Sequence, residues 1–146
     1  MPACGVLLGP WADLTLRAES HKLLAECDVV LDFNDLASGA EAYWGGEDAE
    51  HPAVSPVFAD LTGLPPLLVQ AGGADTLLDD ASALARTAGL AGVAVTLEVW
   101  PEMPHGWQGF SDYLDEAGQA LDAASAWADA KVGSLNISGD GYRRLS

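Results

Sequence analysis

Three short apolar segments predict the strands of a parallel β-sheet. They are residues 4–8 (CGVLL), 65–71 (PPLLVQA) and 93–100 (VAVTLEVW), and glycine or proline follows each of them. The first two are continuous apolar runs, which are typical of strands buried on both faces. In the third, apolar residues alternate with other side chains, which is the spacing of a strand with two different faces.

Three other segments repeat apolar residues three and four positions apart, the spacing of one helical face: residues 32–44, 77–89 and 112–130. Thr76 and Asp79 have the spacing of a capping box at the start of the second, with aspartate in place of the preferred glutamate. Ser111 is expected to cap the third, whose packing stripe would include Tyr113 and Ala117. Asp79 and Asp80 fall in the first turn of the second helix, where their negative charge interacts favourably with the positive end of the helix dipole.

The order of these segments predicts an α/β domain with about three parallel strands over residues 1–132. Strands that alternate with helices pair in parallel through right-handed crossovers. Residues 11–64 separate the first two strands, and a connection of this length indicates a cover or lid. Residues 133–146 are polar and glycine-rich, so we expect a frayed tail.

The composition of the chain argues against several classes of binding partner and predicts its location. Six basic residues against 22 acidic ones give a net charge of −16, which argues against binding to nucleic acid or to an anionic membrane surface. No apolar run has the ~18 residues of a transmembrane helix, and the N-terminus lacks a basic signal-peptide region, so we expect a cytoplasmic protein. Cys4 and Cys27 match no metal or redox spacing, and we interpret both as ordinary thiols.

Asp75 and His105 are the residues whose predicted positions suggest chemistry. Asp75 follows the second strand after a glycine turn, and His105 follows the third after a proline turn. The carboxyl ends of adjacent parallel strands, about 4.8 Å apart, are where such folds place ligands and catalytic groups. An aspartate there can orient an imidazole as a general base. By spacing alone, His105 could equally be a solvent-facing loop residue and Asp75 a helix-entry residue.

Three blocks in order resemble one family: GVLLGPWADLTL, HPAVSPVFADLTGLPPLLVQAGGADTLLDDA and GVAVTLEVWPEMPHGWQGF. They resemble the C-terminal half of the hormone-sensitive-lipase-like esterases of the α/β-hydrolase superfamily, over residues 4 to about 130. The resemblance implies a partial α/β-hydrolase fold containing the last three strands of the family sheet. It also implies that Asp75 and His105 are the acid and base of a Ser–Asp–His triad, and that residues 13–55 form part of the pocket wall or lid.

The nucleophile of that triad does not occur in these 146 residues. The family places its serine in a G-x-S-x-G elbow upstream of the acid, with an HGG-type oxyanion loop further upstream. No serine here has glycine at both flanking positions; Ser38 and Ser138 each precede one glycine, but neither follows a predicted strand and opens a helix. Because the triad runs serine, acid, histidine along the chain, we expect a start downstream of the serine and a protein that is inactive alone.

Two main hypotheses follow. The first is the acid-and-base portion of a carboxylic-ester hydrolase, acting on a small-molecule ester when completed, without a cofactor and with Trp107 as a substrate-binding candidate. The second is a non-catalytic module that pairs with another copy through the exposed edge of its first strand, residues 4–8. A metal hydrolase using His21, His51 and His105 is disfavoured, because no HExxH or comparable ligand spacing occurs, and we expect no metal.

Overall fold

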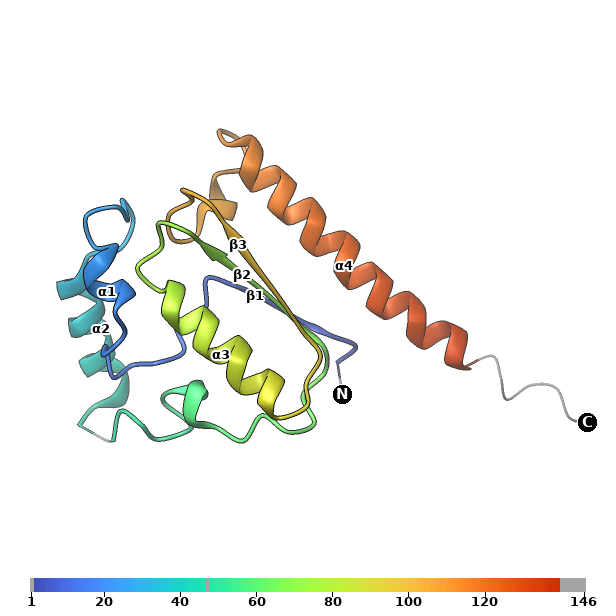
Figure 1. Ribbon diagram of the computed structural model, residues 1–146, viewed down its shortest axis with the longest axis horizontal. Helices are drawn as coiled ribbons and strands as arrows, with labels where there is room; N and C mark the ends of the chain where they lie inside the picture. The colour runs from blue at the N-terminus through green and yellow to red at the C-terminus, as the bar shows by residue number, and fades with distance from the viewer. Residues whose placement is uncertain (1, 47, 140–146) are drawn as a thin grey trace, which may run out of the picture.

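The computed structural model describes residues 2–46 and 48–139, and its centre is a parallel sheet with strand order β1-β2-β3 (Figure 1). The strands are β1 (Gly5–Leu8), β2 (Leu67–Gly72) and β3 (Val95–Trp100). Leu67 on β2 is aligned with Gly5 on one side and with Val95 on the other. The three predicted strands, their parallel direction and the α/β class are therefore confirmed.

Two helices cover opposite faces of the sheet. Val69 and Ala71 of β2 pack against Ala81 and other small side chains of α3 (Leu78–Leu90). Gln70 points to the other face, where its side-chain amide donates a 2.9 Å hydrogen bond to a backbone carbonyl of α4 (Asp115–Gly139). Every residue of β2 is buried, because this strand has a neighbour on both sides and a helix on both faces.

The predicted cap of α3 is wrong. Leu77 stands at the N-cap position and makes no side-chain cap hydrogen bond, and the buried hydroxyl of Thr76 has no hydrogen-bond partner among the described residues. The carboxylate of Asp79 accepts instead from the backbone N–H of Ser20 at 2.8 Å. Because the Asp79 carboxylate binds Ser20 in the cover, it does not close the predicted capping box with Thr76.

The last helix also begins later and ends later than predicted. Residues Trp107–Phe110 form a 3₁₀ turn, η2, so Ser111 lies at its exit and α4 starts only at Asp115. Tyr113 precedes the helix and is 87% exposed, whereas Ala117 is fully buried as expected. The helix reaches Gly139 and so includes the beginning of the predicted tail; residues 140–146 lie outside the described residues.

The first strand is less buried than its apolar sequence predicts. Val6 is 36% exposed and Leu8 42% exposed, although both were expected to be buried on both faces. The reason is that β1 pairs only with β2, and in the described part of the chain no strand lies along its outer edge. Self-association through this edge stays a prediction.

The predicted cover, residues 11–64, contains α1 (Ser20–Leu23), α2 (Phe33–Trp44) and the 3₁₀ turn η1 (Pro56–Phe58). Figure 1 shows α1 and α2 beside one end of the sheet, at the left of the view. The helix predicted over residues 32–44 is confirmed: Asp32 caps its start by accepting from the backbone N–H of Asn34, and Gly45 ends it in a left-handed conformation.

Candidate active site

Asp75 and His105 meet just beyond the carboxyl ends of β2 and β3. The Nδ1 atom of His105 lies 3.2 Å from Oδ2 and 3.3 Å from Oδ1 of Asp75. The carboxylate is completely buried, whereas the side chain of His105 is 24% exposed. Since an ionised carboxylate only accepts hydrogen bonds, this contact places a proton on Nδ1 and leaves Nε2 able to accept another. The sequence placed both residues at this edge, and the structure brings them together.

Glycines allow the two loops that carry this pair to approach closely. The backbone N–H of Gly73 donates to the carbonyl of Trp100 at 2.7 Å, and that of Ala74 donates to Met103 at 3.0 Å. A Cβ atom on Gly72 would lie only 2.1 Å from the carbonyl oxygen of Met103. The Gly-Gly turn that stops β2 therefore also permits the backbone contact between the Asp75 loop and the His105 loop.

We therefore expect Gly72→Ala to destabilise the protein and move the His105 loop. The new methyl group would collide with backbone atoms, which have little freedom to shift, and overpacking of this kind costs about 1–3 kcal/mol. Urea denaturation measures the loss. Gly89→Ala is the matched control, because a Cβ there meets nothing within 4 Å inside α3, and we expect it to be neutral or stabilising. Equal stability of the two variants would contradict the close approach.

The surroundings of His105 favour its protonated form. The hydrogen bond to Asp75 raises the pKa of His105 above its ordinary value of 6.5; burial of the ring opposes this rise, while the charges of Asp75 and Asp28 add to it. The buried partner thus has two effects, because it orients the imidazole and it stabilises the imidazolium that forms when Nε2 accepts a proton.

Asp28 is a residue of this site that sequence reasoning missed. It lies in the cover between α1 and α2, yet one carboxylate oxygen accepts from the backbone N–H of Thr76, next to Asp75, at 2.8 Å. The other oxygen accepts from the backbone N–H of His105 at 3.5 Å. No local pattern marks Asp28, because both contacts join segments that are far apart along the chain.

A second aspartate–histidine pair joins the cover to α3 and is completely buried. Nε2 of His21 is 2.9 Å from Oδ2 of Asp80, and neither side chain is exposed. The other oxygen of Asp80 accepts from the backbone N–H groups of Ala12 and Asp13 at 3.0 and 2.8 Å. The sequence suggested only that Asp80 places charge at the start of α3. In the structure its carboxylate also fixes the first part of the cover, residues 12–21, to that helix at both ends.

Trp107, the predicted substrate-binding residue, is completely buried. Its ring packs against Ala117 and Ala120 of α4 and tilts against Trp100, with the two ring centroids 6.1 Å apart. The structure thus gives Trp107 a packing role in anchoring η2, the turn that follows His105. Contact with a substrate stays a prediction.

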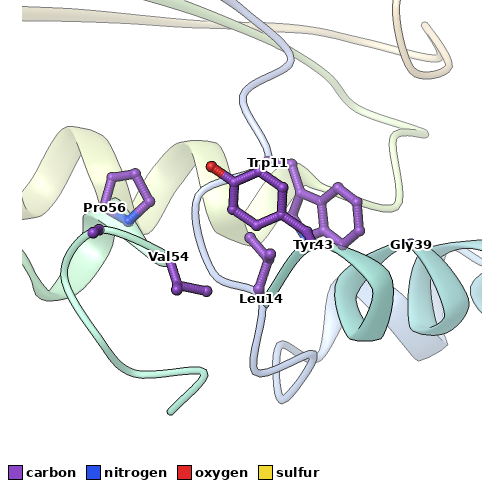
Figure 2. Close-up of a pocket in the computed structure, with 7 residues that line it drawn as sticks. Trp11, Leu14, Gly39, Tyr43, Val54 and Pro56 are labelled. Carbon is purple, nitrogen blue, oxygen red and sulfur yellow. The ribbon is translucent and has the colours of Figure 1, made fainter. Parts of the chain in front are cut away.

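An apolar cavity of about 370 Å³ lies within the cover (Figure 2). Its walls are formed by residues of α2 and of the loops before and after it: Trp11, Leu14, Gly39, Tyr43, Ala53, Val54 and Pro56. The resemblance predicted that residues 13–55 contribute to a pocket wall. The cavity lies mostly within that segment, but neither Asp75 nor His105 lines it.

Three further observations concern other predicted properties. In residues 2–46 and 48–139, no group of three or more His, Cys, Asp or Glu side chains is arranged to hold a metal ion. No helix in the described part of the chain is long and apolar enough to cross a membrane. Cys4 and Cys27 are both free thiols, as expected.

Comparison with known proteins identifies the family. A family profile described as alpha/beta hydrolase fold matches residues 1–109, which is most of the chain. The chain therefore belongs to the α/β-hydrolase-fold family. An acetyl-hydrolase of Streptomyces hygroscopicus is 44% identical over 133 residues, and an esterase of Acinetobacter venetianus is 38% identical over 122 residues.

Solved structures agree with the family assignment, and those that match include proteins of the hormone-sensitive lipase family. An esterase from the bacterial hormone-sensitive lipase family superposes with a TM-score of 0.87 at 45% identity, and a hormone-sensitive lipase from a metagenome library has the same TM-score at 41% identity. Each superposition covers 90% of this chain, but only 44% of the esterase and 45% of the lipase. The chain likewise spans 44% and 40% of the two curated relatives. The chain is similar to esterases of the hormone-sensitive lipase family, and it spans less than half the length of these relatives.

Proposed function

We propose that this chain is the acid-and-base portion of a serine-dependent carboxylic-ester hydrolase. The observation that carries the proposal is the contact between Nδ1 of His105 and the buried carboxylate of Asp75 at the carboxyl edge of the sheet. The acetyl-hydrolase and esterase names of the relatives support an ester as the substrate. In this proposal Asp75 is the acid and His105 the general base.

The proposed chemistry needs a serine from outside these 146 residues. Nε2 of His105 would take the proton of that serine as its oxygen attacks the ester carbonyl, and would then donate it to the departing alcohol. Water would repeat the cycle and release the acid. Because Asp75 raises the pKa of His105, the neutral base becomes populated only as the pH rises above the ordinary histidine value, so hydrolysis should increase with pH in that range.

We expect the 146-residue chain alone to hydrolyse p-nitrophenyl butyrate at least about 10³-fold more slowly than a hybrid enzyme that supplies the missing elements. The hybrid joins the remainder of the Streptomyces acetyl-hydrolase to this chain in place of its matching 133-residue segment. Steady-state hydrolysis of the two purified proteins is the measurement. Comparable rates would contradict the proposed dependence on an external serine, and a folded but inactive hybrid would contradict the proposed function.

A second candidate is a non-catalytic module that associates through β1. Among residues 2–46 and 48–139, no strand pairs with the outer edge of β1, and Val6 and Leu8 are exposed there. Both observations favour this candidate, because an open strand edge offers hydrogen-bonding groups to another strand. The same edge is also where a preceding strand of a larger sheet would pair. The homodimer, the cytoplasmic location and the absence of nucleic-acid partners stay predictions from the sequence.

A further inference from the structure

Asp28 contacts both loops of the candidate site at once. It belongs to the cover, whereas the two loops it contacts follow β2 and β3. Its Oδ2 atom accepts from the backbone N–H of Thr76 at 2.8 Å, immediately after Asp75, and its Oδ1 atom lies 3.5 Å from the backbone nitrogen of His105. A single carboxylate therefore links the loop of the acid with the loop of the base.

The carboxylate is held firmly in place. Oδ1 also accepts from the backbone N–H groups of Val30 and Leu31 at 3.0 and 3.3 Å, which closes a turn around Asp28 itself. Only 7% of the residue is exposed. Burial alone would raise the pKa of Asp28, but the N–H groups of Thr76, Val30, Leu31 and His105 together lower it below its ordinary value, so the group carries a negative charge at neutral pH.

This arrangement differs from an ordinary turn-capping aspartate. The carboxylate of Asp32, in the same cover, accepts from the nearby backbone N–H of Asn34, and the residue is exposed to solvent. The contacts from Asp28 to Thr76 and His105 instead cross 48 and 77 positions of the chain. The two loops already meet through backbone hydrogen bonds and through the Asp75–His105 contact, and Asp28 adds a further, charged connection from the cover.

We propose that Asp28 is a positioning residue of the site, whose carboxylate holds the Asp75 loop and the His105 loop together and keeps the imidazole aligned with Asp75. Its catalytic significance rests on the proposed function, but its geometric role does not. The charged groups that face His105 are Asp75, which binds its ring, and Asp28, which binds its backbone. The cover thus forms part of the support of the acid–base pair.

The test is an NMR titration of the histidine ring protons in the full chain, together with amide hydrogen exchange. In Asp28→Asn one side-chain oxygen is replaced by an NH₂ group, which donates and so can no longer accept from one of the two loops. We expect the pKa of His105 to fall and the Thr76 amide to exchange about tenfold faster or more. The negative charge of Asp28 itself also raises the pKa of His105, so Asp28→Glu, which keeps this charge, is measured beside Asp28→Asn.

Asp32→Asn is the matched control, because it removes the same charge from a turn-capping aspartate of the same cover without a contact to either loop. Asp28→Glu keeps the charge but moves it by one methylene, so positioning predicts a lower pKa of His105 in this variant as well. It also serves alone if Asp28→Asn does not fold. The proposal is overturned if the folded Asp28 variant leaves the His105 pKa and the Thr76 exchange rate as they are in Asp32→Asn. Neither readout uses ester hydrolysis, so an inactive hybrid enzyme would leave this result intact.

Discussion

His105→Ala should abolish ester hydrolysis in the hybrid enzyme, with kcat lower by about 10⁴-fold or more. The reason is that a serine hydroxyl is a weak nucleophile until a base takes its proton, and triad members act as a unit. Asp75→Asn should cost about 10⁴-fold, because an amide in place of the carboxylate can donate to Nδ1 and favour the wrong tautomer of His105. Steady-state hydrolysis of p-nitrophenyl butyrate measures both losses in kcat.

His51→Ala is the control for this experiment. His51 is also a loop histidine, but it is exposed within the cover, and its ring accepts only from the nearby backbone N–H of Ala53. We expect the kcat of this variant to stay within about twofold of the parent, as for a surface change away from the reacting groups. A hybrid that kept most of its activity without His105 would rule out the general-base role.

Asp80→Ala should lower the free energy of unfolding by about 3–5 kcal/mol, the largest stability loss we expect. Removing one member of a buried ion pair leaves the other uncompensated, and His21 is completely buried. The same substitution leaves the backbone N–H groups of Ala12 and Asp13 without their acceptor. A loss of this size is a large fraction of the stability of a typical domain, so urea denaturation should show a much lower midpoint.

Asp79→Ala provides the comparison at the neighbouring position. Asp79 is only partly buried, and its carboxylate accepts a single backbone hydrogen bond, from Ser20. We therefore expect a loss of about 1 kcal/mol. If both variants lost the same free energy, the buried pair would not be the main contact between the cover and α3.

The pH dependence of stability distinguishes the ion pair from simple packing. Burial lowers the pKa of His21, but the hydrogen bond and charge of Asp80, with smaller contributions from Leu16 and Asp13, raise it above 6.5 overall. A raised histidine pKa stabilises the fold fully below the unfolded value and less as the pH rises through the folded value. The difference in stability between the parent and Asp80→Asn should shrink as the pH rises above 6.5. His105 contributes a slope of the same sign to both proteins, so it cancels in this difference.

Local sequence signals predicted most of the fold. The two continuous apolar runs became β1 and β2, and the alternating segment became β3, because buried strands and strands with two different faces carry these two patterns. They also overestimated the burial of Val6 and Leu8, since an apolar side chain carries no information about whether its strand has one neighbour or two. The late start of α4 was missed because the residues before it contain a separate turn, η2, which the buried ring of Trp107 anchors to α4.

The candidate site was predictable only in part, for a physical reason. Asp75 and His105 could be paired from the sequence because adjacent parallel strands bring their carboxyl ends to one edge, so topology alone sets that contact. Asp79 and Asp80 have the same local setting at the start of α3, and nothing in the sequence separates them. Only the folded chain buries Asp80 against His21. The same holds for Asp28, whose two partners in the site loops lie 48 and 77 positions away and become neighbours only when the cover packs on the sheet.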